Sequence, residues 1–157
     1  MARLLLLFAF LVLPALVSSQ TQSPFRIHGQ VYCDTCRAGF ETSKTTYIRG
    51  AIVKIECKDR KSLQPMYTTQ GVTGENGKFI LTVNSDRQDQ ICNTVLVSSP
   101  ISDCRTPDPG RNRSEIILTG DNGAVSNVHF ANQMGFLKDK PLPGCAELIK
   151  KLLYSDS

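Results

Sequence analysis

Two cysteines stand three positions apart in Cys33-Asp34-Thr35-Cys36, a spacing that can serve redox or metal chemistry. A redox pair needs its first thiol at the start of a helix, where the helix dipole lowers the pKa of the thiol. Here the pair follows a strand-like stretch and runs into a polar segment. Zinc needs further ligands at usable spacing, and the chain has no second CxxC and no HxxxH. We therefore expect structural disulfides here and no metal site.

The chain has two histidines, His28 and His129, and each stands opposite the apolar residues of its own predicted strand. We expect both to be exposed and expect no catalytic pair. The sequence lacks GxSxG, HExxH and glycine-rich phosphate-loop motifs. Several carboxylates stand in predicted loops beside basic residues, which is typical of solvated surface: Glu41, Asp59, Glu75, Asp86 and Asp89. We predict no catalytic residue, no cofactor and no enzymatic activity.

Four aromatic residues, Tyr32, Phe40, Tyr47 and Tyr67, could form a platform on which sugar rings stack. The chain has no tryptophan, so this signal is weak. Packing in the core or in hairpins is the interpretation that we favour.

The N-terminus has the pattern of a cleavable secretory signal. Residues 1–19 combine Arg3, an apolar run from Leu4 to Leu13 and small residues before the predicted cleavage. The run is short for a membrane span. We predict a signal peptide at 1–19, a spacer at 20–24 and a single domain at 25–157, secreted to the extracellular space.

All six cysteines follow the predicted signal, and an even count in a secreted chain indicates three disulfides. Asn112-Arg113-Ser114 is the single N-glycosylation sequon, in a predicted loop, and we predict that Asn112 is glycosylated. The formal charge of +4 arises from basic residues interspersed with acidic ones. This is ordinary protein surface, so we expect no nucleic-acid or membrane partner, and we expect a monomer.

The elements that must position these residues are short strands separated by turn signals. Alternating residues predict Val53, Ile55 and Cys57 on one face of a strand, and Phe79, Leu81 and Val83 on one face of another. Apolar residues at helical spacing predict one amphipathic helix over Cys145–Tyr154. The predicted strands are 25–33, 51–57, an edge strand at 65–69, then 79–83, 92–97, 114–119 and 124–131, the last with Val128 and Phe130 on one face.

The opening strand carries the most specific motif of the chain. Its alternation places Phe25, Ile27, Gly29, Val31 and Cys33 on one face, and Arg26, His28, Gln30 and Tyr32 on the other. Within it, the run from Gly29 to Arg37 resembles the signature of the pollen Ole e I allergen family of secreted plant proteins. The matching signature residues are Gly29, Val31, Tyr32, Cys33, Asp34, Thr35, Cys36 and Arg37.

Six cysteines allow fifteen pairings, and spacing alone does not choose among them. Strand phase favours one bridge, because Cys57 and Cys92 both fall on the apolar face of a predicted strand. The Ole e I resemblance implies the whole scheme, namely Cys33 with Cys104, Cys36 with Cys145 and Cys57 with Cys92. Under this scheme the end of the opening strand would hold both the proline-rich loop at 99–113 and the C-terminal helix.

The segments Gly50–Val53 and Thr73–Phe79 also resemble the transthyretin-like sandwich of carboxypeptidase accessory domains. Repeated short strands and both resemblances predict an all-β fold, an Ig-like or transthyretin-like sandwich or partly open barrel of about seven strands, with three disulfides and a short C-terminal helix.

The family resemblance implies roles in pollen hydration, germination or pollen-tube growth, including that of a ligand of a receptor-like kinase ectodomain, with allergenicity in some members. We therefore expect a non-enzymatic extracellular interaction protein. The alternatives are a module that binds cell-wall polysaccharide and, less favoured, a secreted hydrolase.

Overall fold

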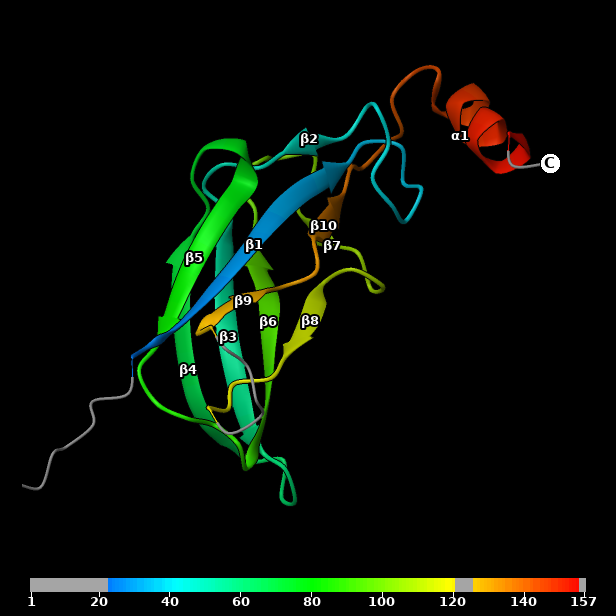
Figure 1. Cartoon of the computed structure of the whole chain (residues 1–157). Coiled ribbons are helices and arrows are strands. Elements are labelled where there is room, and N and C mark those ends of the chain that lie inside the picture. The colour runs from blue at the N-terminus through cyan, green and yellow to red at the C-terminus, as the bar shows by residue number, and fades with distance from the viewer. Residues whose placement is uncertain (1–22, 121–125, 156–157) are drawn as a thin grey trace, which may run out of the picture.

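The structure, a computed structural model, describes residues 23–120 and 126–155. The predicted signal peptide at 1–19, the start of the spacer 20–24 and the start of the strand predicted at 124–131 lie outside the described residues. Within the described part, two sheets enclose one apolar core and a single α-helix follows them (Figure 1). The predicted all-β class, the C-terminal helix and the presence of three disulfides are confirmed.

The described strands outnumber the seven expected, because several are very short. They are β1 Phe25–Asp34, β2 Thr46–Tyr47, β3 Ile52–Asp59, β4 Pro65–Val72, β5 Lys78–Val83, β6 Gln90–Ser98, β7 Thr106–Pro107, β8 Arg113–Ile116, β9 Val128–Phe130 and β10 Met134–Leu137. A 3₁₀ turn, η1, spans Glu75–Gly77, and the helix α1 spans Cys145–Tyr154, as predicted. The sequence analysis missed β2, β7 and β10, because two to four residues are too few to show a period.

Strand β1 is the central strand of the first sheet, and four other strands pair with it (Figure 1). Its first half pairs with β5 on one side and, in parallel, with β9 on the other. Its second half pairs with β2 and, in parallel, with β10. The backbone of one ten-residue strand therefore hydrogen-bonds to four others.

The second sheet has the order β4-β3-β6-β8, so β4 is an edge strand as predicted. The predicted strand phases hold in this sheet and in β5: Val53, Ile55 and Cys57 are fully buried, and the buried residues of β5 are Phe79, Leu81 and Val83. The strand predicted at 114–119 is shorter than expected, since β8 ends at Ile116. These inward-facing residues make the core.

Tyr32 lies on the side of β1 that carries His28 and Gln30, as predicted. It is only 2% exposed, because Phe40, Glu41 and Arg111 surround it, which agrees with the packed role favoured for it. The predicted face of β9 is wrong. In β9, Phe130 is 77% exposed and Val128 is also exposed, whereas His129 points inward and its ring contacts that of Phe25. The register against β1 decides this, because pairing with a half-buried strand sets which face of β9 is buried.

The three disulfides join Cys33 to Cys104, Cys36 to Cys145 and Cys57 to Cys92. These are the pairs that the family resemblance implies. The third bridge links directly paired residues of β3 and β6 within one sheet, whereas the first two leave the end of β1 for the loop before β7 and for α1. The bridged residues lie 71, 109 and 35 positions apart. On a chain-entropy account, loops of this length contribute about 3–5 kcal/mol each.

Helix α1 projects away from the barrel (Figure 1). It is attached by the Cys36–Cys145 bridge and by the preceding turn, where the Leu142 N–H donates to the Thr35 carbonyl at 2.9 Å. Glu147 in its first turn and Lys151 in its last turn both complement the helix dipole. In the described part of the chain, no helix has the length and apolar character needed to span a bilayer.

The bridges predict different outcomes when they are removed. Replacing Cys36 and Cys145 together by serine should release α1 and leave the barrel folded, because few other contacts hold the helix. Limited proteolysis should then cut after Leu137 before it cuts any strand. Replacing Cys57 and Cys92 together by alanine should lower the melting temperature more, because these two residues belong to the apolar core cluster, whereas Cys36 and Cys145 do not. First cleavage within the barrel of the Cys36/Cys145 variant would contradict this assignment.

Candidate functional site

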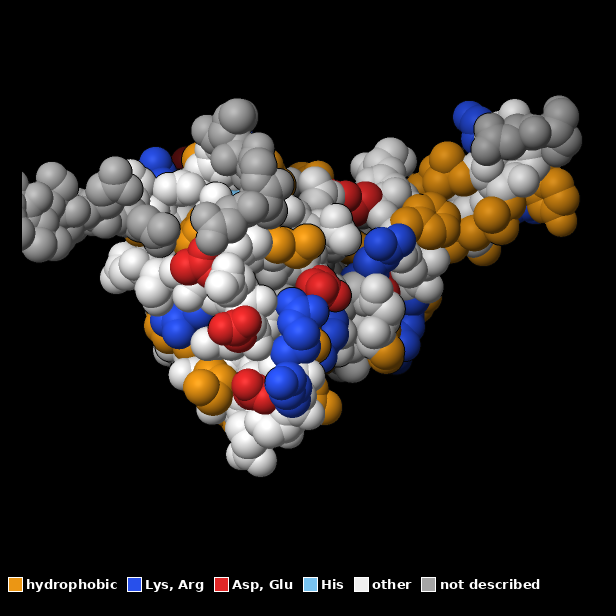
Figure 2. Space-filling model, turned by 60° about the horizontal axis from the view of Figure 1, so that its bottom comes forward, with side chains coloured by type: hydrophobic (Ala, Val, Ile, Leu, Met, Phe, Trp, Pro, Cys, Tyr) orange, Lys and Arg blue, Asp and Glu red, His pale blue; other side chains and the backbone are white. Residues whose placement is uncertain are grey.

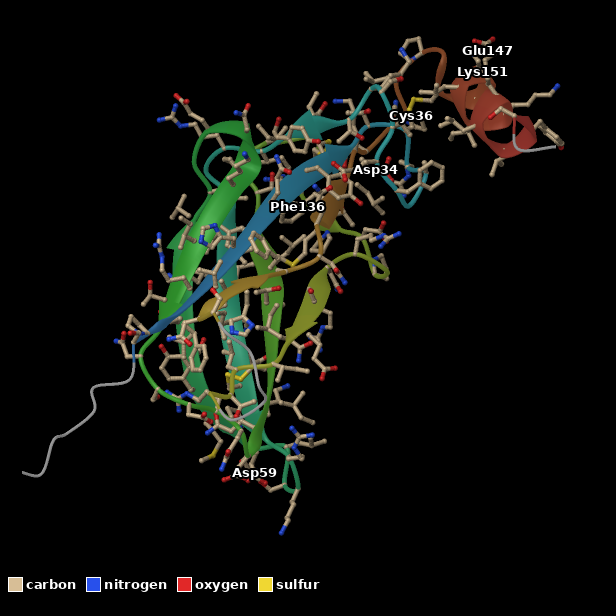
Figure 3. All side chains as sticks on the ribbon, in the orientation of Figure 1. Asp34, Cys36, Asp59, Phe136, Glu147 and Lys151 are labelled. Atoms are coloured by element: carbon tan, nitrogen blue, oxygen red, sulfur yellow. A yellow bond between two sulfur atoms is a disulfide. The ribbon has the colours of Figure 1, made fainter. Side chains whose placement is uncertain are left out.

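The signature carboxylate, Asp34, organises the end of β1. It is 1% exposed, and its two oxygens accept hydrogen bonds from the backbone N–H groups of Gly39, at 2.7 Å, and Cys36, at 3.2 Å. Figure 3 shows Asp34 and Cys36 at the junction between the sheet and α1. A buried carboxylate is stable only when it is hydrogen-bonded in this way, so Asp34 fixes the turn that carries Cys36 toward the helix.

Arg37 ties the same turn to the chain that follows β10. Its backbone is left-handed, with φ of 51°, and its Nη1 donates to the Lys138 carbonyl at 2.8 Å. The Lys138 N–H in turn donates to the carbonyl of Asp34 at 3.2 Å. Arg37 is therefore a structural residue of the junction.

Two glycines make room for aromatic rings. A Cβ at Gly29 would lie 2.2 Å from Cζ of Phe79, and one at Gly135 would lie 2.7 Å from the ring of Tyr32. Each ring lies against bare backbone of a neighbouring strand, because Phe79 pairs with Gly29 and Tyr32 pairs with Gly135. Gly29 and Tyr32 are thus part of the packing, and the family signature describes a scaffold.

The cysteines carry no free thiol among the described residues, which include all six. The described residues also contain no group of three or more His, Cys, Asp and Glu side chains placed to hold a metal ion. Cys33 and Cys36 point to different distant partners instead of to each other.

The two histidines do not meet, although β1 and β9 are paired. His129 faces inward against Phe25, with ring centroids 5.5 Å apart, and His28 faces outward against Phe130 at 5.6 Å. Both are half-buried, so the prediction that both are exposed is wrong. The Nε2 atom of each is buried without a protein hydrogen-bond partner.

A hollow of about 310 Å³ lies on the outward face of β1. His28 and Gln30 line its floor, and the exposed side chains of Ile80 and Phe130 form apolar walls. The amide of Gln30 donates to the Asn76 carbonyl at 2.7 Å, which holds it in place. The hollow is therefore apolar at its rim and polar along its base.

A second hollow of about 390 Å³ adjoins the first and shares Gln133 with it. Tyr32, Glu41 and Arg111 line it, and Gln133 lies within hydrogen-bond reach of both Glu41 and Gln30. His28, Gln30 and Tyr32 alternate along β1, so the two hollows follow one strand. They form one surface, which we call the β1 groove.

Tyr32, which lines the second hollow, and Tyr47, which binds Glu41, keep their protons. Burial raises the pKa of Tyr32 to about 12, against the opposing charge of Arg111. The hydrogen bond that the Tyr47 hydroxyl donates to Glu41, at 2.9 Å, raises the pKa of Tyr47. Both hydroxyls are neutral near pH 7 and remain hydrogen-bond donors.

The other residues singled out in the sequence lie apart from the groove or have structural roles. Tyr67 packs under the guanidinium of Arg87, whose Cζ lies 3.9 Å from the centroid of the Tyr67 ring. The Asp59 carboxylate accepts hydrogen bonds from Lys61 and Ser62 and closes a turn, and these bonds lower its pKa. The structure does not bring the four predicted aromatic residues together as one platform.

Asn112 is half-buried and immediately precedes β8. Its carbonyl accepts a hydrogen bond from the Leu96 N–H at 3.0 Å. The neighbouring Arg111 and Arg113 are exposed. The sequon therefore lies at the surface, at the start of a strand.

The apolar face of α1 forms a second exposed feature. Leu152, Leu153 and Tyr154 are 40%, 65% and 70% exposed. Figure 2 shows hydrophobic side chains gathered along this helix and at its junction with the barrel.

Sequence reasoning missed Phe130, Gln30, Gln133 and Arg111 as candidate binding residues. They come from three separate segments, around residues 30, 111 and 130–133, and no motif links them. The exposure of Phe130 depends on the β1–β9 register, which local alternation did not reveal.

Comparisons with known proteins agree with this architecture. A family model described as "Pollen protein Ole e 1 like" matches residues 23–153. The chain is 52% identical to Protein DOWNSTREAM OF FLC of Arabidopsis thaliana, over 96% of this chain and 91% of that protein. It is 42% identical to Pollen-specific protein C13 of Zea mays, over 83% of this chain and 76% of that protein.

A solved structure shows the same fold. The crystal structure of the major plantain pollen allergen Pla l 1 superposes with a TM-score of 0.70 at 26% identity. The match covers 78% of this chain and 100% of that chain.

The glycine–ring contact can be tested by filling the space. Gly29→Ala should destabilise the fold by about 1–3 kcal/mol, because the new methyl group overlaps the Phe79 ring. Gly74→Ala is a matched control, since its Cβ would meet nothing closer than 3.8 Å. Urea unfolding of both variants measures the difference. Equal stability of the two variants would show that the Phe79 ring can move aside freely.

Proposed function

The chain belongs to the family of pollen proteins like Ole e 1, and on this premise we propose that it is a secreted, non-enzymatic interaction module, an extracellular ligand in pollen or pollen-tube development. One relative is named as pollen-specific, and the solved neighbour is a pollen allergen. The signature residues support this proposal indirectly. They bind the scaffold together, which leaves recognition to other surfaces.

The observation that carries the proposal is the uncovered face of α1. Isolated helices shorter than about 12–15 residues are marginal in water. This one has ten residues, projects from the barrel and exposes Leu152 and Leu153. The Cys36–Cys145 disulfide joins the first residue of the helix to the turn after β1, so the helix is held near the barrel before binding, which lowers the entropic cost of binding.

The partner that we propose is an extracellular protein with an apolar groove, such as a receptor-like kinase ectodomain. An amphipathic helix that lays its apolar face into a groove is a common mode of recognition. The chain itself would act as a monomer in the apoplast.

This proposal predicts that α1 governs binding. In a binding assay against pollen receptor-like kinase ectodomains, Leu153→Glu should weaken affinity about tenfold or more, because it puts a charge into an apolar contact. Ile117→Glu is the matched control, since Ile117 is similarly exposed, at 62% against 65%, but lies on the barrel. An equal effect of both changes, or no saturable binding to any ectodomain, would count against the proposal.

Secretion and modification can be tested together. Expression of the whole chain in plant cells should yield a mature protein that begins near Gln20 and carries a glycan on Asn112. Intact-mass analysis before and after enzymatic deglycosylation would measure both. Asn112→Gln should remove the mass difference. Retention of residues 1–19 in the exported protein would refute the predicted cleavage.

The second candidate function is a cell-wall carbohydrate-binding module. The specific observation that favours it is the β1 groove, where an exposed aromatic ring stands beside several side-chain amides.

A further inference from the structure

We propose that the β1 groove binds a neutral oligosaccharide. A sugar ring would stack on Phe130, and the side-chain amides of Gln30 and Gln133 would form hydrogen bonds with sugar hydroxyl groups. The inference rests on the proposed function for its extracellular setting, and it assigns the ligand to a surface separate from α1. The two hollows are neighbours, because Gln133 lines both. From His28 to Tyr32 the strand extends about 13 Å, so the ligand would be a short run of sugars.

The backbone of β1 argues against an extended peptide as the ligand. A peptide that adds to a sheet needs a free strand edge for main-chain hydrogen bonds. Strand β1 has no free edge here, since β5 and β2 pair on one side and β9 and β10 on the other. The ligand must therefore be recognised by side chains alone.

The rim of the first hollow suits the apolar face of a sugar ring. Phe130 is 77% exposed, and Ile80 on β5 is 50% exposed. The His28 ring supports Phe130, with centroids 5.6 Å apart. An aromatic ring this exposed at the mouth of a hollow offers a flat surface for the C–H groups of a sugar ring. A bound sugar would cover the Phe130 ring and remove its apolar area from water, which favours binding.

The floor of the groove suits hydroxyl groups. A side-chain amide both donates and accepts, as does a hydroxyl group. Gln30 is held by the Asn76 carbonyl and lies next to Gln133, with 3.1 Å between their amides. Asn132 adds a further amide in the second hollow.

The lining of the groove consists mainly of neutral amide and apolar groups, which favours a neutral sugar. Its charged side chains are of both signs: Lys78, which is exposed, lines the first hollow, and Glu41 lines the second together with Arg111. The Glu41 carboxylate offsets the attraction of Arg111 for the carboxylate of a uronic acid, and solvent screens the charge of Lys78.

The experiment titrates the mature, disulfide-bonded protein with four oligosaccharides and follows amide chemical shifts. The neutral probes are galactohexaose, xylohexaose and cellohexaose, and the acidic probe is a galacturonic acid hexamer. At least one neutral probe should bind saturably and shift the amides of β1, β5 and β9. Phe130→Ala and Gln133→Ala should each weaken that binding about tenfold.

Val128→Ala is the matched control, because Val128 lies on the same strand and the same exposed face but lines neither hollow. It should leave sugar binding unchanged, and so should Leu153→Glu. Binding of the acidic probe alone, or equal binding by wild type and both groove variants, would overturn the inference.

The outcome separates this inference from the proposed function. Absence of binding to all four probes, with ectodomain binding intact, would overturn the sugar site and leave the interaction module standing. Saturable sugar binding, with no binding to any ectodomain, would support the sugar site and count against the interaction module. Loss of ectodomain binding in Phe130→Ala would assign the groove to a protein instead and overturn the inference.

Discussion

The pairing of β1 with four other strands is the constraint on which the rest of the structure depends. Ten residues supply hydrogen bonds to β5, β9, β2 and β10, and two disulfides leave the last part of the same segment. The pairings are non-local, and their loop-closure entropy must be repaid by contacts made together. Any change that displaces the backbone of this strand therefore acts on the barrel, the loop at 99–113 and the helix at once.

This constraint explains why the most specific motif of the chain is structural. Asp34 accepts backbone hydrogen bonds, Gly29 gives space to a ring, and Cys33 and Cys36 anchor distant segments. A residue that is buried, and whose polar atoms are hydrogen-bonded within the protein, has few groups with which to contact a ligand. The recognition surfaces that we propose, namely the outward side chains of β1 with its neighbours and the face of α1, therefore depend mainly on other residues.

The two surfaces differ in how they are held. The groove sits on a sheet whose backbone hydrogen bonds are satisfied on both sides, so its side chains are positioned by a rigid platform. The helix has one covalent attachment and few other contacts. A rigid groove suits a small polar ligand that must be matched atom by atom, and a tethered helix suits a larger partner that covers it.

The sequence alone determined the fold class, the helix and most strand phases, because alternation along β3 and β5 and helical spacing along α1 are local properties that burial enforces. It also pointed to the family through one segment. The outward direction of Phe130 and the meeting of Gln30 with Gln133 were decided only by the tertiary structure. The physical reason is register: which face of a short strand is buried depends on the partner it pairs with, and that partner is distant in sequence.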